Sequence, residues 1–255
     1  MSLTLTAIPG IPLIQAGDDL AGLLLQALDA AAITLQDGDV LVLAQKIVSK
    51  AEGRWVNLAT VIPSPRALAL GAEIDKDPRL VELVLQESNA VLRTRPGTIV
   101  VEHKLGFVCA NAGIDHSNVA GDGGQDVEWV LLLPADPDGS AQRLRQRFEQ
   151  AGGCRVGVLI IDSHGRAWRQ GVVGISIGLA GLPGLVDLRG QPDLFGYTLR
   201  ITQIGAADEL AAAASLMMGQ AAEGTPLVHV RGFPYALRES TIKELLRPKE
   251  QDLFR

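Results

Sequence analysis

Cysteine is scarce in this sequence, where only Cys109 and Cys154 occur among 255 residues. The two do not form a CxxC pair, and each lies beside a predicted strand. A zinc site or a disulfide framework needs more cysteines at closer and repeated spacings. We therefore interpret both residues as small buried thiols and assign no chemistry to them.

An excess of positive charge and long apolar runs are also absent. The formal net charge is -6 and the sequence pI is near 5.3, so the clustered Lys and Arg that bind a nucleic-acid backbone are missing. No apolar stretch approaches the length of a bilayer-spanning helix, and the first residues do not resemble a signal peptide. We expect a cytoplasmic protein without nucleic-acid or membrane partners. An anionic ligand would need local positive charge or a metal ion.

The two common nucleotide-binding fingerprints, GxxxxGK[ST] and GxGxxG, do not occur in the chain. The glycine-rich segment 171–184 is the closest approach to a phosphate-binding loop. Close backbone packing explains its glycines equally well. A nucleotide site, if there is one, is therefore not of the P-loop or Rossmann type.

The chain does contain enough apolar residues for a full core, at 47% hydrophobic with a mean hydropathy of +0.20. Periodicity and capping residues predict a helix from Leu20, with its N-cap in Gly17-Asp18-Asp19, and two helices within 63–93, the second capped by Asp77 and opened by Pro78. They also predict helices over 136–153 and 206–220, the latter ended by Gly219. Apolar runs predict strands from Val40 and over 98–103, 106–113, 128–134, 155–161, 197–203 and 226–232. The mixture, with an antiparallel pair around 104–106, indicates an α+β or mixed α/β fold.

Polar side chains follow three of the predicted strands, in segments 45–50, 115–118 and 162–169. Asp115 and Asp162 each offer a carboxylate, and Asn118 and Ser163 offer neutral oxygens. This set suits a hard divalent cation such as Mg2+ or Mn2+ better than zinc. The alternative is that each Asp caps a turn. We favour a shared site, because loops at strand ends are where α/β proteins gather functional groups.

Several other residues are candidates for contact with an anionic substrate. Arg166 and Arg169 lie beside Asp162 and have the forked donors that hold phosphate or carboxylate, and Lys46 and Lys50 could serve the same anion. Glu87 ends an apolar helix stripe and is either an inward-facing group that orients an amine or a cation, or a helix-end residue. We expect His116 and His164 to be solvated loop side chains.

The motifs taken together resemble the F420-0:gamma-glutamyl ligase family. The resemblance is carried by IPGIPLI with GDDL, GDVLVLAQKIVSKAEGR, NAGIDHSNV, LLPADPDGSA, VGVLIIDSHGRAWRQGVVG and ADELAAAASLMMGQAAEGTP, in that order, and reaches residue 232. It implies a GTP-dependent ligase that joins L-glutamate to the lactyl carboxylate of coenzyme F420-0, with a second gamma-linked glutamate in many members. It further implies two divalent ions (Mg2+ or Mn2+), a K+ ion, a two-lobed ligase fold without a P-loop, and a homodimer.

The resemblance also assigns site residues. Its GTP contacts fall on Ile11, Pro12, Leu13, Ile14, Gln45, Lys46, Lys50, Asn118, Met218, Gly219, Gln220, Ala221, Ala222, Glu223, Gly224 and Thr225. Its metal ligands fall on Asp115 and Asp162 for one ion and on Ser163 and Gln220 for the other. We expect Arg166, Arg169 and Glu87 to be the candidates for catalytic or substrate-holding roles.

Two other functions remain open from the sequence. One is a metal-dependent acid-amine ligase that acts on a different acid, and the other is a non-catalytic module that binds GTP and metal. In either case we expect a ligase-type domain over residues 1–235, in one or two interleaved lobes, and a charged helical tail over 236–255.

Overall fold

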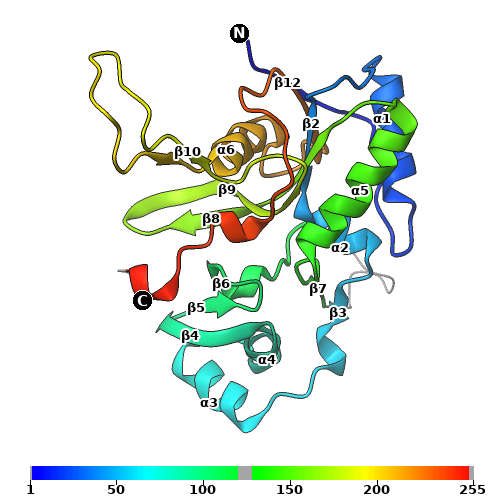
Figure 1. Cartoon of the computed structure of the whole chain (residues 1–255). Coiled ribbons are helices and arrows are strands. Elements are labelled where there is room, and N and C mark those ends of the chain that lie inside the picture. Colours follow the sequence, from blue (N-terminus) through cyan, green and yellow to red (C-terminus); the bar gives the residue numbers. More distant parts are fainter. Residues whose placement is uncertain (1, 120–127, 253–255) are drawn as a thin grey trace.

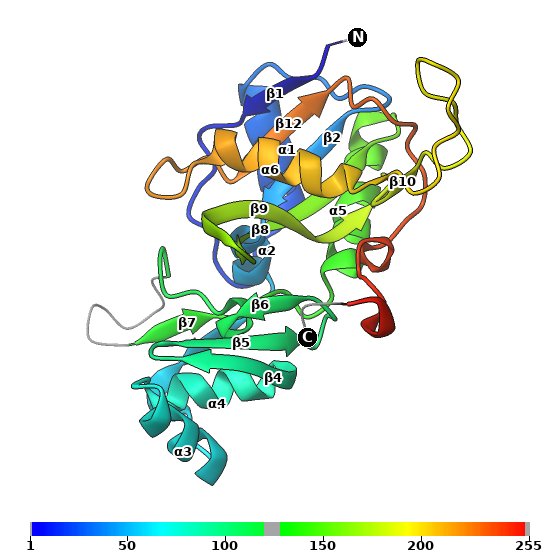
Figure 2. The same cartoon turned by 90° about the vertical axis from the view of Figure 1, so that its left-hand side faces the viewer.

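The computed structural model describes residues 2–119 and 128–252, and the chain forms two lobes (Figures 1 and 2). The upper lobe is built on a five-stranded sheet in the order β1 (Thr4–Ala7), β12 (Leu227–Arg231), β2 (Val40–Ala44), β8 (Gly157–Arg166) and β9 (Arg169–Ala180). Strands β2 and β8 are parallel, and the other neighbours are antiparallel. The predicted α+β fold is confirmed.

Helices cover both faces of the upper sheet. Helices α1 (Leu20–Ala30) and α5 (Pro137–Gly152) lie on one face and α6 (Ala206–Met218) on the other (Figure 2). Alternate residues of β2 confirm this arrangement, because Leu41 and Leu43 belong to the core on the α1 and α5 side, whereas Val40 and Val42 belong to the core under α6. The inner strands are therefore buried on both faces, as their continuous apolar runs predict.

The lower lobe consists of smaller sheets and two short helices. Strands β4 (Ser88–Arg95), β5 (Thr98–His103) and β6 (Val108–Ala110) form an antiparallel sheet, and β3 (Trp55–Asn57) pairs with β7 (Trp129–Leu131). Helices α3 (Pro65–Glu73) and α4 (Pro78–Gln86) begin at Ser64 and Asp77, whose side chains accept hydrogen bonds from the first turn. One hydrophobic core runs through both lobes and includes Leu41 of β2 and Ile99 of β5.

Helix α2 (Gln45–Ala51) joins the lobes and corrects one expectation. The polar residues 45–50 that follow the strand from Val40 form a helix and not a loop, because the strand ends at Ala44 and α2 begins directly at Gln45. A helix places Gln45 and Ser49 on one buried face, while Lys46 and Lys50 lie on the side of the lower lobe. A strand buried on both faces cannot accommodate this run of polar side chains.

Two further expectations, a helix end over residues 88–93 and a strand over 197–203, are wrong. Residues 88–95 form β4 and not the end of a helix, because Pro96 and Gly97 turn the chain back into β5. Within 197–203, Gln203 alone belongs to a strand, β11 (Gln203–Ile204), which pairs with β10 (Val186–Asp187), and Thr198 forms an isolated bridge with Pro192. The tail that the sequence predicts as helical contains two 3-10 helices, Ile242–Glu244 and Lys249–Gln251, and no α-helix over the described residues 236–252.

Strands β8 and β9 form one long hairpin, and the polar residues 162–169 lie within this hairpin. Asp162 and Ser163 lie within β8 and not in a loop after it, and Arg166 pairs with Arg169 at the tip. The glycines of β9 allow close packing, since a Cβ at Gly174 would meet the carbonyl of Ala211 in α6 at 2.6 Å. The packing explanation of this glycine-rich segment is therefore confirmed.

Among the described residues, no helix combines the length and apolar character of a membrane span.

Candidate active site

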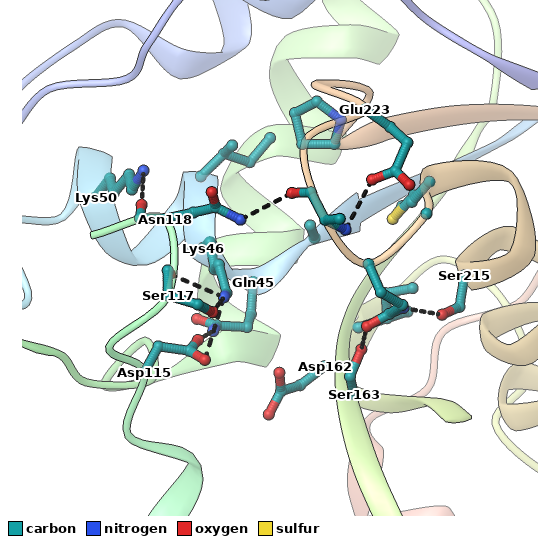
Figure 3. A pocket seen from close by; sticks show the side chains of 18 of the residues that line it. Gln45, Lys46, Lys50, Asp115, Ser117, Asn118, Asp162, Ser163, Ser215 and Glu223 are labelled. Carbon is teal, nitrogen blue, oxygen red and sulfur yellow. Dashed lines mark hydrogen bonds and ion pairs between the residues drawn. The ribbon is translucent and has the colours of Figure 1, made fainter. Parts of the chain in front are cut away.

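A cavity of about 810 Å³ opens between the lobes (Figure 3). Five segments contribute to its wall: helix α2, the loop between β1 and α1, the segment after β6, strand β8 of the hairpin, and the loop after α6. Every residue that the resemblance assigns to GTP or metal contacts lines it, including Ile11, Gln45, Lys46, Lys50, Asp115, Asn118, Asp162, Ser163 and residues 218–225. Segments far apart in the sequence are thus brought to one site.

Asp115 is the carboxylate that the lower lobe presents to the cavity. Its backbone exchanges two hydrogen bonds of 3.0 Å with Leu131 of β7, which fixes its position. The chain reaches it through a tight turn in which Asn111 and Ala112 both have positive φ, at 50° and 53°. Residues without glycine's freedom hold this conformation at a cost, and such strain is concentrated at functional sites.

Two side chains of α2 contact the Asp115 carboxylate across the lobe boundary. Gln45 donates from Nε2 to Oδ2 at 2.5 Å, and the Lys46 ammonium lies 3.2 Å from Oδ1. Gln45 is 1% exposed, and its Oε1 accepts a hydrogen bond of 2.9 Å from the buried Ser49 hydroxyl. Ser49 thus fixes one end of the Gln45 amide while the other end holds Asp115.

The pKa of Asp115 is raised to about 6. Burial is the main cause, Lys46 opposes it, and the charge of Asp162 raises the pKa further. The two carboxylates therefore interact electrostatically although they come from different lobes. Two carboxylates whose charges repel each other are an arrangement that a cation between them would stabilise.

Asp162 and Ser163 of β8 extend the site towards α6. The Ser163 hydroxyl donates to Oε1 of Gln220 at 2.9 Å, and Nε2 of Gln220 donates to Oγ of Ser215 at the same distance. In Figure 3, Asp162 lies between Asp115 and this cluster of Ser163 and Ser215. This orientation of the Gln220 amide places its carbonyl oxygen beside the Ser163 hydroxyl at the cavity wall.

The donor set fits a hard divalent cation. Asp115, Asp162, Ser163 and Gln220 all offer oxygen, which Mg2+ and Mn2+ prefer. Within residues 2–119 and 128–252, no three or more His, Cys, Asp or Glu side chains form a metal-binding group. A cation at this wall would therefore be held by two carboxylates together with neutral oxygens.

Two lysines form the cationic side of the cavity. The Lys46 ammonium also contacts Ser117, at 3.0 Å from its hydroxyl, and the Lys50 ammonium donates to the carbonyl of Asn118 at 2.8 Å. Burial and the charge of Lys46 lower the pKa of Lys50, which also lies 5.5 Å from the Trp55 ring centre. Adjacent ammonium groups of this kind favour an anion with several charges, such as a polyphosphate.

The loop after α6 closes the opposite side. Gly219 and Gly224 have positive φ, and the Glu223 carboxylate accepts a hydrogen bond of 2.8 Å from the Ala221 amide. Asn118 donates from Nδ2 to the Ala221 carbonyl at 3.1 Å, so this loop and the lower lobe meet over the cavity. The helix end that the sequence predicts at Gly219 is confirmed.

Three candidate residues do not line the cavity. Arg166 and Arg169 are exposed at the tip of the β8–β9 hairpin, beyond Asp162. Glu87 ends α4 and pairs with Arg54 at 2.8 Å, with Lys104 at 3.8 Å from its other oxygen. Its carboxylate orients two protein cations at the edge of the lower lobe and does not reach the site.

His164 is the functional candidate that sequence reasoning missed. The expectation that it is a solvated loop residue is wrong, because it is 7% exposed, lines the cavity and contacts Asp162. His116 is exposed, as expected. The alternation of a strand could have identified His164, because residues two apart in β8 share a face.

Comparison with known proteins gives a consistent result. The family model described as F420-0:Gamma-glutamyl ligase matches residues 10–232. A protein of Methanothermobacter thermautotrophicus called Coenzyme F420:L-glutamate ligase is 47% identical over 257 residues, covering 100% of both chains. Proteins with the same name from Archaeoglobus fulgidus (44% identical, 100% of this chain and 97% of the relative) and Methanopyrus kandleri (44%, 95% and 93%) are also similar.

Proposed function

The chain belongs to the F420-0:gamma-glutamyl ligase family, and from this membership we propose that it joins L-glutamate to the lactyl carboxylate of coenzyme F420-0 in a GTP-dependent reaction. A second, gamma-linked glutamate is part of the proposal. The observation that carries it is the cavity between the lobes, where two carboxylates, two lysines and two neutral oxygen donors face one space. This combination supports phosphoryl transfer without a P-loop.

The proposed reaction has two steps. An oxygen of the lactyl carboxylate attacks the γ-phosphorus of GTP, which forms an acyl phosphate and releases GDP. The amine of L-glutamate then attacks the carbonyl carbon, phosphate leaves with the former carboxylate oxygen, and the amine loses a proton as the amide forms. Activation is needed because a carboxylate is a poor acceptor for an amine.

The side chains of the cavity suit the first step. Lys46 and Lys50 lie where they can bind phosphate oxygens, and the loop 218–225 and the segment 11–14 enclose the nucleotide. In this proposal Asp115 and Asp162 hold one Mg2+ or Mn2+ ion, Ser163 and Gln220 hold the second, and a K+ ion accompanies them. The ions would supply positive charge against the phosphate oxygens. The protein's part is to hold donors and acceptor in line.

Arg166 and Arg169 take a more distant role in this proposal. Because they lie at the hairpin tip beyond the cavity, we assign them to the anionic diester of F420-0 or to the glutamate carboxylate, where these extend out of the site. Glu87 retains a role in orienting Arg54.

A homodimer is also part of the proposal. An arm between β10 and β11 projects from the upper lobe (Figure 1) and exposes large apolar side chains, with Leu194 at 98% and Phe195 at 93%. Exposed apolar side chains gathered on one projecting segment are typical of a protein interface. A second copy of the chain is the proposed partner, and the mass of the protein in solution tests it.

The test of the function is an incubation of the purified protein with F420-0, L-glutamate, GTP, Mn2+ and K+, followed by mass spectrometry of the deazaflavin. We expect a gain of one or two glutamyl units that disappears when GTP or the divalent ion is left out. Consumption of GTP with unchanged F420-0 would favour the ligase of a different acid. Binding of GTP without turnover would favour a non-catalytic module.

A further inference from the structure

We propose that His164 is a positioning residue that orients the carboxylate of Asp162 towards the cavity. The inference rests on the proposed role of Asp162 as a metal ligand. It adds a residue that the expected ligand set does not include. Its basis is the geometry of β8 and of the ring cluster packed against it.

Asp162 and His164 lie two residues apart on β8 and share one face of the strand. Nε2 of His164 is 2.9 Å from Oδ2 of Asp162. An ionised carboxylate can only accept hydrogen bonds, so the proton of this bond belongs to Nε2. The bond occupies one oxygen of Asp162 and fixes the plane of the carboxylate, which leaves Oδ1 for a ligand.

The His164 ring is held in place by the lower lobe. Phe107, in the turn between β5 and β6, packs against it at 5.4 Å between ring centres. Phe107 in turn stacks on His103 at 5.2 Å, and Nδ1 of His103 accepts a hydrogen bond of 3.0 Å from the Leu105 amide in the same turn. The position of Asp162, in the upper lobe, is thus set partly by residues of the lower lobe.

The other ring nitrogen of His164 supports a role directed at Asp162. Nδ1 is buried and has no hydrogen-bond partner among the described residues. A histidine kept only for stability would be expected to use both nitrogens. Its one polar contact is therefore with the carboxylate that faces the cavity.

The molecule contains a matched control. His229 and Asp39 form a second buried pair with the same distance of 2.9 Å between Nε2 and Oδ2, but neither residue lines the cavity. Substituting His229 tests what the loss of a buried histidine–aspartate bond does to the protein in general. Substituting His164 tests what it does to the site.

The experiment is a titration of the purified full-length protein with Mn2+ alone, with free Mn2+ measured by electron paramagnetic resonance. His164→Leu keeps the bulk against Phe107 and removes the donor, whereas His164→Gln keeps a donor near the position of Nε2. We expect about a 10- to 100-fold weaker Mn2+ affinity in His164→Leu, the range typical of lost partners of metal ligands. His164→Gln should recover most of the affinity, and His229→Leu, which removes the donor to Asp39, should lower the melting temperature without changing Mn2+ binding.

The outcomes separate this inference from the proposed function. Asp162→Asn is measured in parallel, and wild-type affinity in that variant would overturn the metal role itself. Loss of affinity in Asp162→Asn with none in His164→Leu would overturn the positioning role alone. An equal loss in His229→Leu would overturn it too, because the effect would then be one of general stability. If His164→Leu does not fold, the comparison of wild type with His164→Gln decides, since the inference requires near-normal binding there.

Discussion

Two buried histidines among the described residues, His164 and His229, each contact an aspartate at 2.9 Å, but the surroundings of the two pairs differ. Asp39 is bonded by His229, by two nitrogens of Arg231 at 2.9 and 2.7 Å, and by the Gln36 amide at 2.9 Å. The carboxylate of Asp162 has one hydrogen-bond partner within residues 2–119 and 128–252, which is His164, and it faces a cavity with a second acid. A carboxylate whose partners are all in the protein stabilises the fold, whereas one left with free acceptor capacity is available to a ligand.

Electrostatics separate the two regions in the same way. Burial raises the pKa of Asp39, but the hydrogen bonds from Arg231 and His229 outweigh it, and the pKa is lowered overall. At the cavity, burial and the charge of Asp162 outweigh Lys46 and raise the pKa of Asp115 to about 6. Protein groups therefore compensate the negative charge of Asp39, and we call Asp39, His229 and Arg231 the compensated cluster. The negative charges of Asp115 and Asp162 are compensated less completely, and we call these two acids the open cluster.

The largest expected effect is on stability, at the compensated cluster. Asp39→Ala leaves His229 buried without its partner and Arg231 without its ion pair, and removing one partner of a buried pair typically costs about 3–5 kcal/mol. Urea unfolding followed by circular dichroism measures this loss. Ligase activity per folded molecule should stay at the wild-type level, and a specific loss of activity would contradict the separation of the two regions.

At the open cluster the same kind of change should affect activity instead. Asp162→Asn removes a proposed metal ligand, so kcat/KM for glutamate ligation should fall by more than about 100-fold, beyond what partners of ligands typically cost. The unfolding free energy should change little, because the amide can still accept from His164. Full activity with GTP would disprove the metal role of Asp162.

The raised pKa of Asp115 predicts a dependence of stability on pH. In the folded protein this acid holds its proton up to about pH 6, whereas in the unfolded chain it loses it near 3.8. Between these values the folded state binds more protons, so the contribution of Asp115 to stability is complete below about pH 4 and is lost as the pH rises through 6. The rise of the pKa from 3.8 to about 6 corresponds to about 3 kcal/mol, at 1.36 kcal/mol per pKa unit.

The check is the pH profile of the unfolding free energy without divalent ions. Asp115→Asn should flatten the fall between pH 4 and 6, which isolates this group from the other acids. Asp39 contributes with the opposite sign, because its lowered pKa favours the folded state at higher pH. A profile that is unchanged in Asp115→Asn would show that Asp115 is not desolvated as the structure has it.

A smaller effect is expected at Gln45, where two interpretations give different results. The resemblance makes it a nucleotide contact, but its amide is bonded to Asp115 and Ser49. Gln45→Ala should weaken ligation by about 10-fold, the equivalent of one hydrogen bond to a charged group. If Gln45 positions Asp115, the variant needs a higher Mn2+ concentration for half-maximal activity, and its KM for GTP is unchanged. A rise confined to the KM for GTP would support the nucleotide contact.

Local signals in the sequence were sufficient for much of the fold. The caps at Asp19 and Asp77 and the glycine stop at Gly219 are confirmed, because a cap depends on a few neighbouring residues. The error at β4 was avoidable, since Pro96 and Gly97 are a turn signal. The residues of 162–166 do not by themselves indicate that β8 continues past Asp162 as part of a hairpin. That continuation depends on pairing with β9, a tertiary contact.

The site was predictable as a set of residues but not as an arrangement. The sequence suggested that Asp115 and Asp162 act together, yet it held no information that they come from different lobes. Nor could it pair Glu87 with Arg54, because their contact depends on how α4 packs. His164 was missed because its burial follows from Phe107, which belongs to the other lobe. Each miss concerns a contact between segments distant in the chain.

The smallest effect is expected at the hairpin tip, which belongs to neither cluster. Arg166 and Arg169 are exposed and lie outside the cavity wall, so each is free to reach a substrate group in solvent, where a single charge contact is screened. Arg166→Ala or Arg169→Ala should raise the KM for F420-0 by a few-fold, with kcat and the KM for GTP unchanged, since less than about 1 kcal/mol is involved. The effect should shrink as salt is added. A large fall in kcat that does not change with salt would contradict this role. It would mean that the hairpin tip closes over the cavity during turnover, and that Arg166 or Arg169 then joins Asp115 and Asp162 in the site.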